Sequence, residues 1–145
     1  MKRRGRANWL VIAGLAGLVM MVVIYILGRE SASSVAQRFM LALAAGDAEK
    51  LTDLSYCKDI PKQDMQKKWD YAVHTAGPYY RFTWAITGEV ETSGDSAAVK
   101  MMLTRAVNTQ SSFEEPYDIP MVKTSDGWKV DVLGLNRKVF PALPH

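Results

Sequence analysis

Residues 79–86 read YYRFTWAI, and this stretch decides the fold class because the spacing of apolar residues changes there. Every second residue in it is large and apolar: Tyr80, Phe82, Trp84 and Ile86. Such alternation is typical of a strand with one buried face. Upstream, apolar residues recur every three or four positions, as on the buried face of a helix, and downstream the alternation continues. Helices gathered before strands predict an α+β domain.

More strands are predicted after this one. Two long stretches of apolar and β-branched residues, 97–107 and 113–123, follow it, and Trp128 begins a last strand after the turn TSDG. Gly88 indicates a bend within the first strand. The sequence therefore predicts a curved antiparallel sheet of about four strands, with helices covering its concave face.

About three helices are predicted upstream of the sheet. The first begins at Ser34, where the phrase SVAQ matches a capping box, and ends at Gly46. A short second helix follows Asp47, whose side chain is a good helix cap. Residues 55–60 are a predicted loop, and the third helix covers residues 61–75 and ends before a Gly-Pro pair.

The residues 9–27, WLVIAGLAGLVMMVVIYIL, carry no charge. A helix of that length spans roughly 28 Å, close to the ~30 Å hydrocarbon core of a bilayer. The apolar part of a signal peptide is shorter, about 7–15 residues. The run therefore predicts a single transmembrane helix, with secretion after signal cleavage as the alternative. The predicted organisation is a basic tail (1–8), this helix, a short linker (28–33) and one domain (34–145).

Basic residues are concentrated before this run. Four of the 18 precede it, and the remaining 14 face all 15 acidic residues. Because the domain is nearly neutral, no nucleic-acid interface is predicted. The positive-inside rule keeps the tail in the cytoplasm and places the domain outside. The predicted location is the cell membrane, single-pass. The predicted partners are the lipid bilayer, through residues 9–27, and a protein partner or a second copy of the chain.

Three short phrases occur in a characteristic order: ALAAGD at 42–47, GDSAAV at 94–99 and DGWKV at 126–130. With the helices and strands around them, they resemble the nuclear transport factor 2-like superfamily, a cystatin-like α+β cone, and especially its small membrane-anchored bacterial members. The resemblance covers roughly residues 33–135. It implies a cone of helices packed on a curved sheet. It implies no reaction, because this fold hosts enzymes and non-enzymes alike.

No catalytic constellation, metal-ligand spacing or cofactor motif is found, so we expect no catalytic residue, metal or cofactor. Asp70 and His74 lie four positions apart on the predicted third helix, where an ordinary surface pair explains them. Cys57 is the single cysteine, which excludes an intrachain disulfide. It is interpreted as a small, partly buried apolar residue.

Five aromatic residues are expected around the concave face: Trp69, Tyr80, Phe82, Trp84 and Trp128. Such a set describes a hydrophobic core or an apolar ligand pocket, and the core is the favoured interpretation. The leading hypothesis is a non-enzymatic, membrane-anchored extracytoplasmic module that binds a protein partner or a small apolar ligand, or acts as a scaffold. The alternatives are a cone-pocket enzyme of the isomerase or dehydratase kind, and a scaffold subunit of a conjugation or secretion machine.

Overall fold

The computed structural model describes residues 5–27, 30–80, 82–108 and 111–145; the side chains at 5–10, 24–27, 91–92, 106–108 and 111–112 are not described. The contacts divide the chain into two units, Met1–Glu30 and Ser31–His145.

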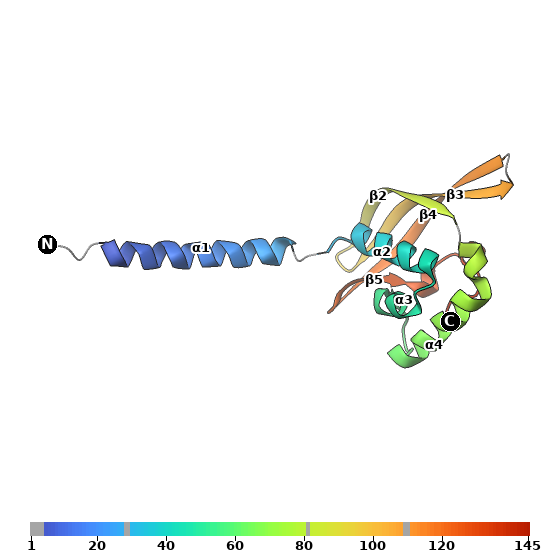
Figure 1. The fold of residues 1–145 in the computed structure, drawn as a ribbon, viewed down its shortest axis with the longest axis horizontal. Coiled ribbons are helices and arrows are strands. Elements are labelled where there is room, and N and C mark those ends of the chain that lie inside the picture. The colour runs from blue at the N-terminus through green and yellow to red at the C-terminus, as the bar shows by residue number, and fades with distance from the viewer. Residues whose placement is uncertain (1–4, 28–29, 81, 109–110) are drawn as a thin grey trace. The chain divides into compact units, whose positions relative to one another are not determined.

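The first unit contains the helix α1 (Gly5–Leu27), drawn in blue in Figure 1. Every described side chain in it is exposed, and the large apolar ones are Val11, Ile12, Leu15, Leu18, Val19, Met20, Met21, Val22 and Val23. Within the described residues, we find no helix with the length and apolarity needed to span a membrane. The predicted span at 9–27 extends beyond the described side chains, and residues 1–4 and 28–29 of the predicted tail and linker lie outside the described residues.

The second unit begins with three helices, as predicted: α2 (Ala32–Ala45), α3 (Ala48–Leu54) and α4 (Lys62–Ala76). Gly46 ends α2 with φ at 68°, a left-handed conformation that favours glycine. Asp47 caps α3, because its carboxylate accepts a hydrogen bond of 3.1 Å from an amide in the first turn. Both predicted helix boundaries are therefore confirmed.

The predicted start of the first helix at Ser34 is wrong. Ser31 is the N-cap, because its Oγ accepts a 3.1 Å hydrogen bond from the Ser34 amide, and the helix begins at Ala32. The Glu89 carboxylate also accepts hydrogen bonds from the Ser33 amide, at 3.0 Å, and from its hydroxyl, at 2.5 Å. A carboxylate stabilises a helix N-terminus. This second contact comes from a distant strand, so no local pattern could show it.

The sheet has five strands in the order β1-β5-β4-β3-β2. Four of them pair antiparallel, as predicted: β2 (Thr83–Ser93), β3 (Ser96–Asn108), β4 (Ser111–Thr124) and β5 (Gly127–Asp131). The fifth, β1 (Ser55–Tyr56), lies in the predicted loop and pairs in parallel with β5. The sheet is therefore mixed, and the prediction of a purely antiparallel sheet is wrong. The short strand forms only because a distant partner supplies its hydrogen bonds.

The first long strand begins later than predicted. Its first two predicted residues belong to η1 (Gly77–Tyr80), a 3₁₀ helix that continues the end of α4. Within β2, the register shifts between Ile86 and Gly88. After this bulge Glu89 pairs with the buried Val99, so it lies on the same face of the sheet as Ile86. The bulge thus places a carboxylate where α2 begins.

The helices cover one face of the sheet, and α2 packs against all four long strands (Figure 1). The core between these layers includes Phe39, Trp69, Val99 and Ile119. After β5 the chain forms a short 3₁₀ helix, η2 (Val132–Gly134), and ends beside α4 (Figure 1). This last segment contributes further buried side chains, which matter for the site.

Candidate functional site

Trp69 is completely buried between the helices. Its ring packs edge-to-face against Phe39 with the centroids 5.7 Å apart, and its Nε1 donates a 3.1 Å hydrogen bond to Ser55 Oγ. The ring therefore serves to hold α4 against α2 and α3. Its one polar atom is satisfied within the protein.

Tyr80 and Phe82 both contact the segment that follows β5. Both are buried, and the Phe82 ring meets Phe140 edge-to-face at 5.8 Å. The Tyr80 hydroxyl donates a hydrogen bond to the Pro141 carbonyl. Burial raises the pKa of Tyr80 to about 12, so this hydroxyl keeps its proton at neutral pH.

Trp84 and Trp128 are half-buried and lie apart from this pair. Trp84 Nε1 donates a 3.0 Å hydrogen bond to Gln37 on α2. The Lys123 ammonium lies 5.7 Å from the centre of the Trp128 ring. The five predicted rings therefore occupy different parts of the core and its rim. The hollows described below are lined by none of them, and their role in ligand binding stays a prediction.

The C-terminal segment, residues 136–144, occupies the concave face beside Tyr80 and Phe82. Phe140 is completely buried, and its ring also meets Tyr117 at 6.1 Å. Sequence reasoning missed this segment, because it forms no regular element. The available signal was the phrase VFPALP, in which Val139, Phe140 and Leu143 are large apolar residues close to two prolines, a composition unusual for a solvated segment.

Arg105 on β3 holds this segment against the sheet, and Arg137 within the segment donates hydrogen bonds to the Leu143 and Pro144 carbonyls. Arg105 Nη2 donates a 2.9 Å hydrogen bond to the Val139 carbonyl, and its guanidinium lies 5.4 Å from the centre of the Phe82 ring. Its Nε is buried and has no hydrogen-bond partner within the described part of the chain. A guanidinium has donors to spare for a planar acceptor such as a carboxylate.

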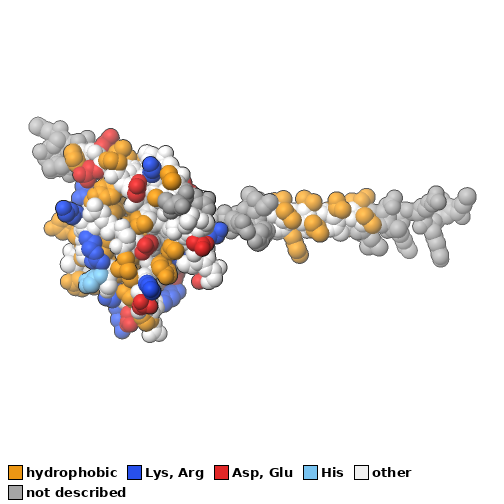
Figure 2. All heavy atoms as spheres, turned by 180° about the vertical axis from the view of Figure 1, so that it is seen from behind, with side chains coloured by type: hydrophobic (Ala, Val, Ile, Leu, Met, Phe, Trp, Pro, Cys, Tyr) orange, Lys and Arg blue, Asp and Glu red, His pale blue; other side chains and the backbone are white. Residues whose placement is uncertain are grey.

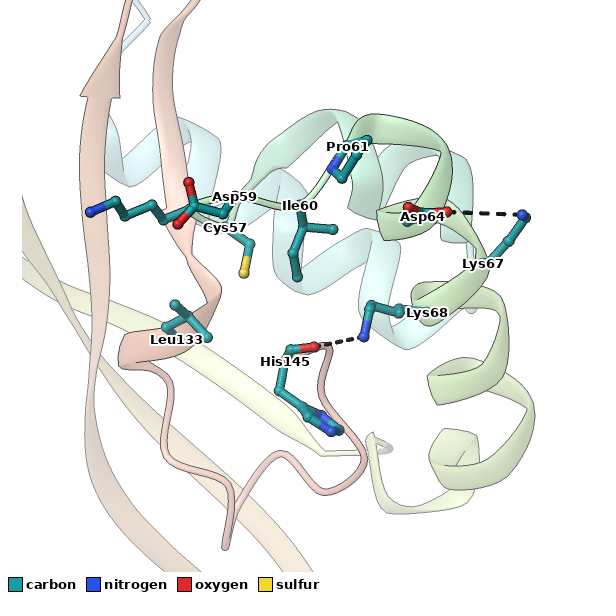
Figure 3. A pocket seen from close by; sticks show the side chains of 10 residues that line it. Cys57, Asp59, Ile60, Pro61, Asp64, Lys67, Lys68, Leu133 and His145 are labelled. Carbon is teal, nitrogen blue, oxygen red and sulfur yellow. Dashed lines mark hydrogen bonds and ion pairs between the residues drawn. The ribbon is translucent and has the colours of Figure 1, made fainter.

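A surface hollow of about 510 Å³ lies between the loop before α4 and the end of the chain (Figure 3). Cys57, Ile60 and Leu133 line it together with three lysines and two aspartates. Lys68 Nζ donates a 2.6 Å hydrogen bond to the backbone oxygen of His145. The lining combines an apolar floor with charges of both signs.

The Cys57 thiol in this hollow is not activated. Burial raises its pKa, and the nearby Asp131 carboxylate adds to the effect. The thiolate is the reactive form, so Cys57 stays a weak nucleophile at neutral pH. This agrees with the interpretation of Cys57 as a buried apolar residue.

Two other hollows have different linings. One of about 390 Å³ lies beside β1, and its Asp53 carboxylate is paired with Lys62 at 2.6 Å. The other, of about 530 Å³, lies on the outer side of α2 and α3, where Leu41 is exposed between Arg38 and Lys50. These linings combine apolar side chains with charges of both signs.

The predicted side-chain pair on α4 does not form. His74 Nδ1 lies 2.6 Å from the backbone carbonyl of Asp70, so the ring closes onto its own helix. Among the described residues, no group of histidine, cysteine and acidic side chains could hold a metal ion. Neither finding supplies a catalytic group.

No protein-family model matches the chain, and no curated protein matches it. Among solved structures it is similar to a ketosteroid isomerase-like protein from Erwinia carotovora atroseptica, with 15% identity over 67% of this chain and 85% of that chain and a TM-score of 0.45. An NTF-2-like protein of unknown function from Shewanella oneidensis has 11% identity over 66% and 88% of the two chains and a TM-score of 0.44. A protein of unknown function from Mycobacterium tuberculosis has 15% identity over 67% of each chain and a TM-score of 0.43.

The description of the Shewanella oneidensis protein is the one of these three that uses the name NTF-2-like. At these identities and TM-scores the likeness carries no statement about function.

Proposed function

We propose that the chain is a non-enzymatic, membrane-anchored binding module. Residues 9–27 cross the bilayer, the basic tail stays in the cytoplasm, and the α+β domain faces outside, where it binds a protein partner. The proposal is supported by the charge pattern around the apolar run and by the exposed apolar surface of α1.

The exposed surface of α1 is the observation that carries the proposal. Large apolar side chains follow one another on all sides of the helix between Val11 and Val23, and all of them are exposed. A helix that is apolar all round needs either a protein core or a membrane. The domain beginning at Ser31 is a separate unit with its own core, so a bilayer is the environment that would bury α1.

The domain supports binding at its surface. Its core is filled by its own side chains, and the described residues contain no metal cluster. On the face seen in Figure 2, acidic and basic side chains are interspersed with apolar ones over the domain. Interfaces with transient protein partners have the same mixed composition as the rest of a protein surface, so a face of this kind can form one.

Anchoring is tested by placing charges in the middle of the apolar run. The double variant Leu18→Arg with Val19→Arg adds two guanidinium groups there, each costing about 2.5–3.5 kcal/mol of insertion free energy. We expect this variant to leave the membrane fraction. The matched control places two arginines at Leu41 and Leu133, which are exposed in the domain, and should remain membrane-bound.

Orientation and processing are read from the same membranes. Protease added to spheroplasts, in which the cell membrane is intact and its outer face is accessible, should digest the domain and spare the basic tail. A mature chain that begins near Ser34 by mass spectrometry would contradict anchoring and support secretion. A protein partner is sought by cross-linking in intact membranes. Cross-linking that yields neither another protein nor a second copy would contradict the binding function.

A further inference from the structure

The C-terminal segment is held on the concave face in the manner of a bound peptide. The carbonyls of Val139 and Pro141 accept hydrogen bonds from the side chains of Arg105 and Tyr80. Between these two carbonyls, the Phe140 ring is completely buried. The segment is turned rather than extended, so side-chain donors on alternate carbonyls with an aromatic anchor between them resemble the recognition of a peptide turn.

The surface that receives the segment is built by the rest of the domain. We call it the C-terminal groove: Tyr80 from η1, Phe82 before β2, Arg105 on β3 and Tyr117 on β4. Phe82 and Tyr117 both meet the Phe140 ring edge-to-face, at 5.8 and 6.1 Å. Edge-to-face contacts of this kind add specificity for an aromatic side chain.

The segment contributes little regular structure of its own. The amides of Val139 and Phe140 both donate to the Asn136 carbonyl, which closes a local turn. Ala142 has φ at 59°, a left-handed conformation that an alanine rarely adopts. The backbone of Ala142 is therefore strained when the segment occupies the groove, which lowers the stability of the occupied state. A peptide without that constraint would avoid this cost.

The fit between groove and segment is also incomplete. Arg105 Nε is buried, and within the described residues it has no hydrogen-bond partner. A buried donor left unsatisfied weakens binding. A ligand that makes the same contacts and supplies one more acceptor, such as a carboxylate or a hydroxyl, would therefore fit better than the chain's own segment.

We propose that the C-terminal groove is a peptide-binding site that residues 136–144 occupy in cis. Its ligand in trans is a turn-forming segment of another protein with an aromatic residue followed by proline and an added acceptor for Arg105. This inference rests on the proposed binding function and names its site. The cis segment competes with that ligand, so a partner binds only after displacing it.

The test measures binding of a fluorescein-labelled peptide with the sequence of residues 136–144, NRKVFPALP, to the full chain in detergent micelles. Fluorescence anisotropy compares the wild-type chain with the Phe140→Ala chain, whose own segment lacks the aromatic anchor. We expect the Phe140→Ala chain to bind the peptide at least about 100-fold more tightly, because the competing segment is weakened. A control peptide with alanine in place of Phe140 should bind neither chain.

Two further measurements sharpen the result. Arg105→Lys, added to the Phe140→Ala chain, should weaken peptide binding about tenfold, because the planar donor to the Val139 carbonyl is lost. A set of peptides is also made, each with aspartate at one position of NRKVFPALP. The peptide whose aspartate reaches Arg105 Nε should bind more tightly than the unchanged peptide.

Several outcomes would overturn the proposal. One is a Phe140→Ala chain that still unfolds cooperatively but binds no peptide. Another is a Phe140→Ala chain that no longer unfolds cooperatively, because residues 136–144 would then be an ordinary part of the core. A wild-type dimer that the peptide dissociates would show that the occupant is a second copy. If the groove variants still cross-link to a partner in membranes, this inference fails while the proposed binding function stands.

Discussion

Tyr80 offers a test of the concave face that depends on pH. Its hydroxyl is buried and donates to the Pro141 carbonyl, and burial raises its pKa from the ordinary value of 10.0 to about 12. The folded chain therefore keeps a proton that the unfolded chain releases in this range. Stability from this group is complete below pH 10 and is lost as the pH rises towards 12. A shift of about two pKa units corresponds to roughly 2–3 kcal/mol.

The perturbation is Tyr80→Phe in the full chain. At pH 8 the variant should be less stable by about 1–3 kcal/mol, because the Pro141 carbonyl loses its donor. Phenylalanine does not ionise, so the variant does not lose unfolding free energy through residue 80 as the pH rises. The difference in unfolding free energy between the two proteins should therefore shrink by roughly 2–3 kcal/mol between pH 10 and 12.

The assay is urea unfolding in detergent micelles, followed by tryptophan fluorescence at a series of pH values. Tyr117, whose pKa is also raised by burial, and the lysines titrate in both proteins, so their effects cancel in the difference. A stability gap that stays constant through this range would refute the reasoning. It would mean that the Tyr80 hydroxyl reaches water in the folded chain.

Three further predictions concern other parts of the domain. Gly46→Ala should lower the unfolding free energy by about 1–2 kcal/mol in urea titrations, because φ is 68° there and no close neighbour adds a clash; an unchanged value would contradict it. Glu89→Gln should lower the melting temperature by weakening two hydrogen bonds from Ser33, at a cost of about 0.5–1.5 kcal/mol, whereas Glu114→Gln on the exposed surface should change almost nothing; equal effects would count against the helix-cap role. Cys57 should react with iodoacetamide at least about tenfold more slowly in the folded chain than in urea, as measured by mass spectrometry, because burial raises its pKa; equal rates would show that the thiol is open.

The sequence by itself determined the features that depend on neighbouring residues. The alternation predicted the long strands, although the first begins at Thr83 rather than at Tyr79, and Gly46 and Asp47 marked the boundary between two helices correctly. These signals are local, because a cap or a strand face is decided by side chains within a few positions. The charge asymmetry around residues 9–27 is local in the same sense and supports the proposed anchor.

The tertiary structure decided what depends on distant partners. β1 exists because β5 pairs with it, and α2 begins at Ala32 with help from Glu89, which a bulge turns towards the helix. Five aromatic residues looked equivalent in the sequence, yet two of them, Tyr80 and Phe82, contact the C-terminal segment: Phe82 packs against Phe140, and Tyr80 donates to the Pro141 carbonyl. The concave face beside Tyr80 and Phe82 is filled by residues 136–144, and this depends on how the chain packs after β5. Packing of this kind is set by shape and by unsatisfied donors in three dimensions, and no periodicity in the sequence encodes it.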